Sequence, residues 1–98
     1  MDFAAFEASL SGDAPPAELS QALAGLWWDG KGDWARAHDC AQAQDDAAGS
    51  AVHAYLHRKE GDLSNAGYWY RRAGRPVARG TLAQEWQALA EDLLRPAG

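Results

Sequence analysis

The chain has 98 residues and a formal net charge of −5, which suits one domain with a modest core and is too short for two. The acidic balance argues against a nucleic-acid-binding protein, which needs a cationic surface to displace counterions. The single cysteine, Cys40, excludes an internal disulfide, and no apolar run approaches the length of a membrane span. We therefore expect a cytoplasmic protein that contacts neither nucleic acid nor membrane.

The first half of the chain predicts three helices. A short one is expected over residues 2–9. The second begins with Pro15-Pro16, because proline suits the first turn of a helix, and it ends near Gly30. Asp33 then serves as the N-cap of the third. The apolar side chains of the second helix recur at helical spacing: Leu19, Leu23, Leu26 and Trp27.

The second half predicts three more helices. The first of them begins with Asp46 or Ser50 as its cap and ends at Gly61, where a left-handed glycine stops the helix. Asp62 caps the next helix. The last one begins with Thr81-Leu82-Ala83-Gln84, which matches a capping box. No segment alternates with period two for long enough to be a strand.

The glycine–aspartate hinge at Gly61-Asp62 also occurs at Gly32-Asp33, an offset of 29 positions. Small or apolar residues match at nearly every inward position around the two hinges. The sequence therefore predicts an all-α domain over residues 1–98, built from two stacked helix–turn–helix hairpins. The hairpins span about 16–45 and about 47–76, and a helix over about 81–94 caps the exposed face of the second.

The repeated unit resembles a divergent tetratricopeptide-like or Sel1-like repeat. In the second unit the matching residues are Gly61, Asp62, Leu63, Ala66, Tyr70 and Ala73, and in the first they are Gly25, Trp28, Gly32, Trp34 and Ala37. The offset is shorter than the roughly 34 residues of the standard repeat, and His53 and His57 replace apolar residues. The resemblance implies a right-handed array and a scaffold that binds peptides or partner proteins, although fold alone does not give function.

His53 and His57 are the most specific chemical signal in the sequence. They lie four residues apart on a predicted helix, so both imidazoles project from one face. His38 lies on the preceding helix, which packs against this one in a stack of hairpins. The three could bind a divalent transition metal such as zinc, with Glu60 nearby. Metal binding is the alternative here, and the sequence favours histidines that are partly buried and bonded to neighbouring helices in a protein without a cofactor.

Most of the positive charge falls in one third of the chain and is interleaved with aromatic residues. Arginine beside aromatic side chains is typical of partner-binding hot spots and anion sites. A solvated surface that pairs with nearby carboxylates is the alternative. Trp27 and Trp28 are adjacent and cannot both face one way, so a half-exposed Trp28 would suit binding. The candidate partner surface consists of Trp28, Tyr68, Arg71, Arg72 and Arg75.

The sequence contains no nucleophile motif and no phosphate-binding loop, which favours a non-enzymatic function. The first hypothesis is a small cytoplasmic module that binds a protein or peptide, preferably anionic, through this surface. The second is a metal- or small-ligand-binding protein, with catalysis as an extension, that uses His38, His53 and His57. The third is a structural homodimer, since two hairpins leave apolar edges that self-association could cover.

Overall fold

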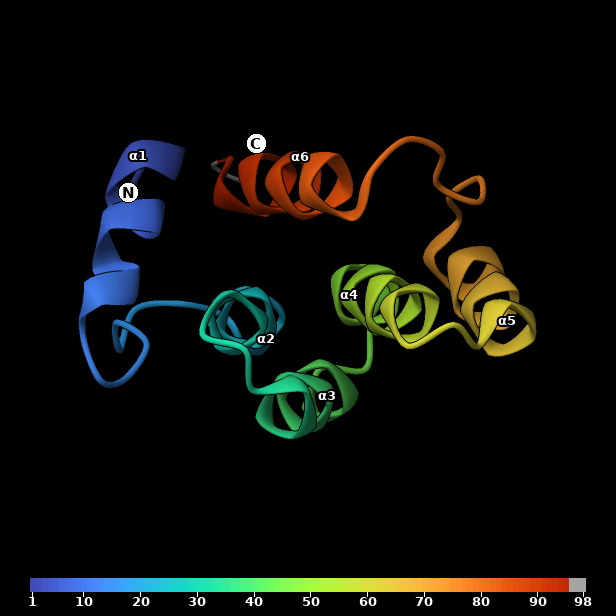
Figure 1. The fold of residues 1–98 in the computed structure, drawn as a ribbon, viewed down its shortest axis with the longest axis horizontal. Helices are drawn as coiled ribbons and strands as arrows, with labels where there is room; N and C mark the ends of the chain where they lie inside the picture. The colour runs from blue at the N-terminus through green and yellow to red at the C-terminus, as the bar shows by residue number, and fades with distance from the viewer. Residues whose placement is uncertain (96–98) are drawn as a thin grey trace.

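The computed structural model describes residues 1–95, in which the chain forms six α-helices, one short 3-10 helix and no strand (Figure 1). The elements are α1 (Phe3–Ala8), η1 (Ser9–Ser11), α2 (Gln21–Gly30), α3 (Trp34–Ala43), α4 (Ala47–Lys59), α5 (Leu63–Ala73) and α6 (Leu82–Leu94). The predicted all-α class is confirmed, and adjacent helices pack as hairpins, α2 with α3 and α4 with α5. None of the described helices is long and apolar enough to cross a membrane.

Capping chemistry sets the helix boundaries. Every helix from α2 to α6 follows a residue whose side-chain oxygen accepts a hydrogen bond from a backbone N–H of the first turn. These caps are Ser20, Asp33, Asp46, Asp62 and Thr81. The predicted caps Asp33 and Asp62 are confirmed, and so is the capping box of Thr81 and Gln84. Of the two candidates for α4, Asp46 is the cap, accepting a bond of 2.9 Å from the N–H of Gly49.

The two glycine–aspartate hinges share one geometry. Gly32 has a φ of 83° and Gly61 a φ of 89°, both in the left-handed region that favours glycine. In each hinge the aspartate N–H donates to a carbonyl five residues earlier, at 2.9 Å. The predicted hinges are thus confirmed. The resemblance to tetratricopeptide repeats stays a prediction.

The predicted start of α2 at Pro15-Pro16 is wrong, because α2 begins only at Gln21. A residue that precedes proline is pushed toward extended backbone, so Pro15 cannot easily join a helix that continues through Pro16. Ser20 is extended, with a ψ of 164°, and its hydroxyl caps the N–H of Leu23 at 3.2 Å. Pro16 instead begins a turn ahead of the helix, in which its carbonyl accepts a bond of 3.2 Å from the N–H of Leu19.

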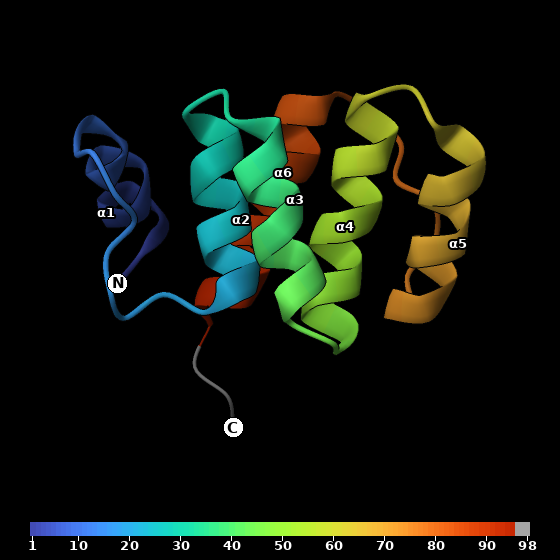
Figure 2. The ribbon, with the colours of Figure 1, turned by 90° about the horizontal axis from the view of Figure 1, so that it is seen from below.

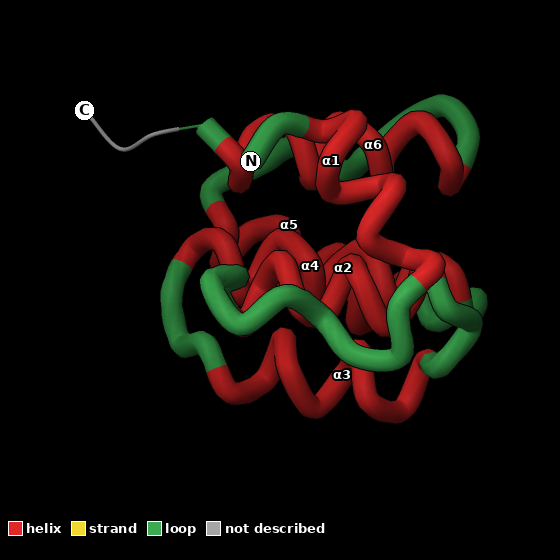
Figure 3. Tube along the Cα trace, turned by 90° about the vertical axis from the view of Figure 1, so that its left-hand side faces the viewer, coloured by secondary structure: helices red, strands yellow, loops and turns green. Residues whose placement is uncertain are grey.

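The helices form three layers (Figure 3). Helices α2, α4 and α5 lie side by side in the middle, and α3 lies on one side of them (Figures 1 and 2). Helix α6 crosses the opposite side and packs against both α2 and α4, while α1 packs against α6. The last helix thus covers α4 of the second hairpin and α2 of the first, whereas the prediction placed it on the second hairpin alone.

The main core lies where α6 crosses α2 and α4. Its largest fully buried side chains are Trp27, Phe6, Leu26, Leu56 and Val52. Trp86 of α6 donates its indole N–H to the carbonyl of Leu26 at 2.9 Å, which fixes α6 on α2. Trp27 is fully buried, and Trp28 is half-buried, as expected of adjacent residues on a helix.

Candidate metal centre

The three histidines of the chain converge on one site. His53 and His57 project from α4 and His38 projects from α3, and ring nitrogens of all three lie within 4.8 Å of one another. The Nε2 atoms of His38 and His53 are 2.9 Å apart. The predicted convergence of the three side chains is therefore observed, although what they bind is a separate question.

Burial and aromatic stacking enclose this histidine cluster (His38, His53 and His57). His53 is 4% exposed and His57 is 6% exposed, whereas His38 is half-buried. Trp69 of α5 stacks on His53 with ring centroids 3.9 Å apart, and Trp34 of α3 stacks on His38 at 5.0 Å. The rings are held on two sides by tryptophan, and access from solvent is through His38.

A carboxylate and an amide orient His57. Its Nδ1 lies 2.6 Å from Oε1 of Glu60, and its Nε2 lies 3.3 Å from the side-chain amide nitrogen of Asn65. When Nδ1 donates its proton to Glu60, the lone pair of Nε2 accepts from the amide of Asn65, which a metal ion at Nε2 would have to displace. A carboxylate that accepts from one ring nitrogen fixes the tautomer of a histidine and raises the basicity of its other nitrogen. Histidines that bind metals are usually oriented by such a carboxylate.

The electrostatics keep His53 neutral. The pKa of His53 is lowered to about 4, first by burial and then by the neighbouring His38 and His57. At neutral pH its imidazole therefore carries no charge and offers a lone pair. Metal binding requires this form of the ligand, because a protonated imidazole cannot coordinate.

The spacing of the ring nitrogens suits a shared ion. With bonds of about 2.0–2.1 Å, two nitrogen ligands of a tetrahedral zinc ion lie about 3.4 Å apart. The cluster places one pair at 2.9 Å and all three nitrogens within 4.8 Å. The 2.9 Å pair is a hydrogen bond in which one Nε2 donates to the other, so binding an ion requires loss of that proton and a separation of the two nitrogens to about 3.4 Å. Glu60 and Asp62 form a second, more exposed group with His57, also within 4.8 Å.

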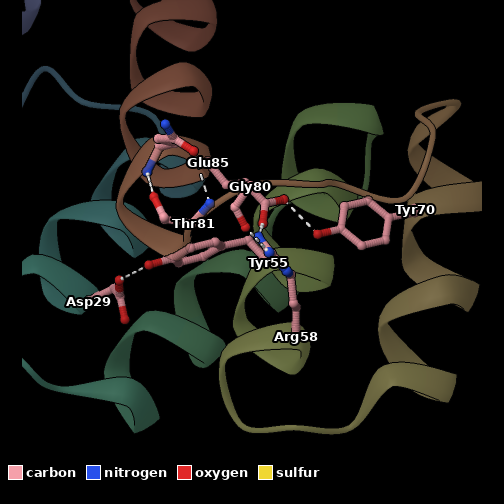
Figure 4. Close-up of polar contacts among 8 residues, drawn as sticks. Asp29, Tyr55, Arg58, Tyr70, Gly80, Thr81 and Glu85 are labelled. Atoms are coloured by element: carbon pink, nitrogen blue, oxygen red, sulfur yellow. Dashed lines mark hydrogen bonds and ion pairs between the residues drawn. The ribbon is translucent and has the colours of Figure 1, made fainter.

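Away from the histidine cluster, side chains of α4 bond to two buried carboxylates, Asp29 of α2 and Glu85 of α6, which the sequence did not indicate (Figure 4). Asp29 of α2 accepts hydrogen bonds from the hydroxyl of Tyr55 at 2.7 Å and from Nζ of Lys59 at 2.8 Å. The only sequence signal for this group is a carboxylate directly after the apolar run that ends with Trp27 and Trp28.

The second of these groups joins three helices. Glu85 of α6 accepts a bond of 2.9 Å from Arg58 of α4 and a bond of 2.6 Å from the hydroxyl of Tyr70 of α5. Arg58 also donates to the carbonyl of Gly80 (Figure 4). Burial and the bond to Glu85 raise the pKa of Tyr70, so its hydroxyl stays protonated and donates. These contacts explain why Glu85 is buried although it is charged.

The candidate partner residues do not form one surface. Tyr68 is 44% exposed on α5, and the exposed Arg72 lies over its ring and donates to its hydroxyl at 3.2 Å. Arg71 is exposed on the same helix. Arg75 is half-buried and pairs with Asp92 of α6 at 3.3 Å, the kind of carboxylate pairing that the alternative interpretation of the arginines predicts.

Trp28 lies apart from that group. It belongs to α2, at the other end of the row of helices from α5 (Figure 2). Its ring lies 5.0 Å from that of Trp27 and 4.5 Å from the guanidinium of Arg36 on α3. Trp28 therefore packs between the two helices of the first hairpin, through its contact with Arg36 of α3. The surface on α5 consists of Tyr68, Arg71 and Arg72.

The fold and the site together define an all-helical protein with a buried cluster of three histidines. No protein family model matches the chain, and neither curated proteins nor solved structures gave a match.

Proposed function

We propose that the chain is a metal-binding protein whose histidine cluster holds one divalent transition ion, with zinc as the leading candidate. The convergence of ring nitrogens from His38, His53 and His57 at a largely buried position carries this proposal. Neutral imidazoles are preferred ligands of zinc, and three nitrogen ligands leave a fourth tetrahedral position for water or another ligand. The ion would join α3 to α4, under the cover of Trp69 from α5.

Zinc should bind tag-free protein with a stoichiometry of about one ion per chain, because all three histidines of the chain belong to the cluster. Elemental analysis of the purified protein and calorimetric titration of chelator-treated protein measure this. An ion present at 100 times its dissociation constant should stabilise the fold by about 2.7 kcal/mol. A chelator should then lower the unfolding temperature of the zinc-loaded protein.

Three variants sharpen this test. His38→Ala removes the most accessible ligand and should abolish stoichiometric binding. Glu60→Gln should weaken zinc binding about 10- to 100-fold, as expected for a carboxylate that orients a ligand. Glu91→Gln changes an exposed carboxylate on α6 and should leave binding unchanged. Equal zinc affinity in His38→Ala and wild type would contradict the proposal, and so would an absence of binding by wild type. In that case the histidines are structural.

A second candidate function is the interaction module favoured by the sequence. The observation that supports it is the exposed face of α5, where the guanidinium of Arg72 lies 5.1 Å from the ring of Trp69 and 5.9 Å from that of Tyr68. Arg71 makes no ion pair within residues 1–95. Such a surface suits an anionic protein or peptide. A cytoplasmic location and a homodimer remain predictions.

Replacing both Arg71 and Arg72 by alanine should remove partner binding and spare the fold, because both side chains are exposed. A pull-down with wild type and the double variant compares them, and binding to wild type should weaken as salt rises, because salt screens exposed charges. Arg95→Ala, at the exposed end of α6, is the control. Recovery of the same specific partners by wild type and the double variant would argue against this surface.

A further inference from the structure

A pocket of about 470 Å³ lies on the face of α4 opposite the histidine cluster. Residues of α1, α2, α4 and α6 line it, together with Leu10 of η1. Its volume is within the range of about 300–1,000 Å³ typical of sites for small molecules. Because the two sites lie on opposite faces of one helix, this pocket is independent of the proposed metal centre.

Aromatic and aliphatic side chains form fixed walls. The rings of Phe3 and Trp86 meet edge to face with centroids 5.8 Å apart, and Leu10 adds an aliphatic surface. The bond from Trp86 to the carbonyl of Leu26 holds the indole in place. Gly30 leaves room for this arrangement, since a Cβ there would lie 3.1–3.2 Å from Leu10 and 3.2 Å from Trp86. These walls suit a flat apolar molecule.

The polar lining of the pocket offers the ammonium of Lys59 as a charged hydrogen-bond donor, beside the exposed side-chain amide of Gln87. Both oxygens of Asp29 are engaged, one by Tyr55 and one by Lys59. Tyr55 commits its hydroxyl proton to Asp29, and burial raises its pKa so that it stays protonated. The ammonium of Lys59 has three protons, and within residues 1–95 Asp29 is its one hydrogen-bond acceptor. The side chain of Lys59 is 39% exposed and lines the pocket, so two protons are available to a ligand.

The charges of the pocket favour a neutral ligand. Asp29 offsets the charge of Lys59, and the exposed Glu7 adds a negative charge to the lining. A carboxylate would be repelled by Glu7 and by a chain of net charge −5. An amine in place of this oxygen would be repelled by the ammonium of Lys59, although Glu7 on α1 would attract it. An uncharged molecule with an oxygen acceptor meets neither obstacle.

We propose that this pocket binds a small, uncharged aromatic molecule whose carbonyl or hydroxyl oxygen accepts a hydrogen bond from Lys59. The aromatic ring would lie against Phe3 and Trp86, and the oxygen would point to the ammonium group.

Acetophenone is the probe, and ethylbenzene, benzoate and benzylamine are its comparisons. Each is titrated into ¹⁵N-labelled protein, and the chemical shifts of the backbone amides and the indole N–H groups are followed. Acetophenone should shift the signals of Phe3, Lys59 and Trp86, and should bind about tenfold more tightly than ethylbenzene, because it adds a hydrogen bond to a charged donor. Shifts that map elsewhere, or tighter binding of benzoate or benzylamine, would overturn the proposed ligand class.

Two variants test the pocket itself. Ala83→Phe places a ring in the pocket from an exposed position on α6 and should weaken acetophenone binding at least tenfold. Ala35→Phe, exposed on α3, is the matched control and should bind as wild type. Lys59→Met should reduce acetophenone to the affinity of ethylbenzene. Unchanged acetophenone binding by Ala83→Phe would overturn the proposal, whether or not the Lys59 variant folds.

Discussion

Replacing Glu85 by alanine is expected to lower the free energy of unfolding by about 3–5 kcal/mol, the cost of removing one partner from a buried charged group. The Glu85 side chain is 7% exposed, and Arg58, its ion-pair partner, is 18% exposed. Without the carboxylate, the guanidinium of Arg58 loses its counter-charge and the buried hydroxyl of Tyr70 loses its acceptor. The large effect arises because these unpaired groups remain buried.

Urea unfolding of wild type and variant at pH 7 measures this loss. Tyr70→Phe removes only the hydroxyl and should cost about 1–2 kcal/mol, since Glu85 keeps its bond to Arg58. Asp92→Ala breaks the half-exposed pairs with Arg75 and Arg95 and should cost less than about 1 kcal/mol. A loss below about 1 kcal/mol for Glu85→Ala would show that the buried carboxylate does not hold α4, α5 and α6 together.

Metal-free protein should lose about 3 kcal/mol of stability between pH 6.5 and pH 4 through His53 alone. The pKa of His53 is about 4 in the folded chain, against 6.5 for a free histidine. Below pH 6.5 the unfolded chain therefore binds a proton that the folded chain does not, and stability falls as pH falls until the folded pKa is reached. Well above pH 6.5, where neither form of the chain protonates His53, this contribution is constant.

The pH dependence of the free energy of unfolding, measured in wild type and in His53→Gln, shows whether His53 causes this loss. In His53→Gln the part of the slope between pH 6.5 and pH 4 that belongs to His53 should disappear, whatever the stability of the variant at pH 7. Equal slopes for wild type and His53→Gln would mean that the folded protein protonates His53 as readily as the unfolded chain does.

Local chemistry explains which parts of the fold were predictable. Asp33, Asp62 and Thr81 act on backbone groups within three residues, so the sequence alone predicts where α3, α5 and α6 begin. Pro15-Pro16 misled the prediction for α2, because proline suits both a first helical turn and a turn ahead of a helix. The extended backbone and hydroxyl of Ser20 decide between the two.

The sequence predicted the histidine cluster but not the buried carboxylates Asp29 and Glu85. The spacing of His53 and His57 places both on one face, and hairpin packing brings His38 alongside. The bonds of Glu85 depend instead on the angle at which α6 crosses α4, which no local pattern of residues encodes. The separation of Trp28 from Tyr68 likewise depends on the tertiary arrangement.

The bond between Trp86 and Leu26 spans 60 residues, while the hairpins α2–α3 and α4–α5 join neighbours in the chain. Contacts between neighbours close short loops at little entropic cost, whereas the docking of α6 closes a long one. We therefore expect the hairpins to form first and α6 to dock afterwards on the surface that they build. Until α6 docks, the apolar faces of α2 and α4 would be exposed to water, and we expect the chain to be most prone to associate with other chains in this interval.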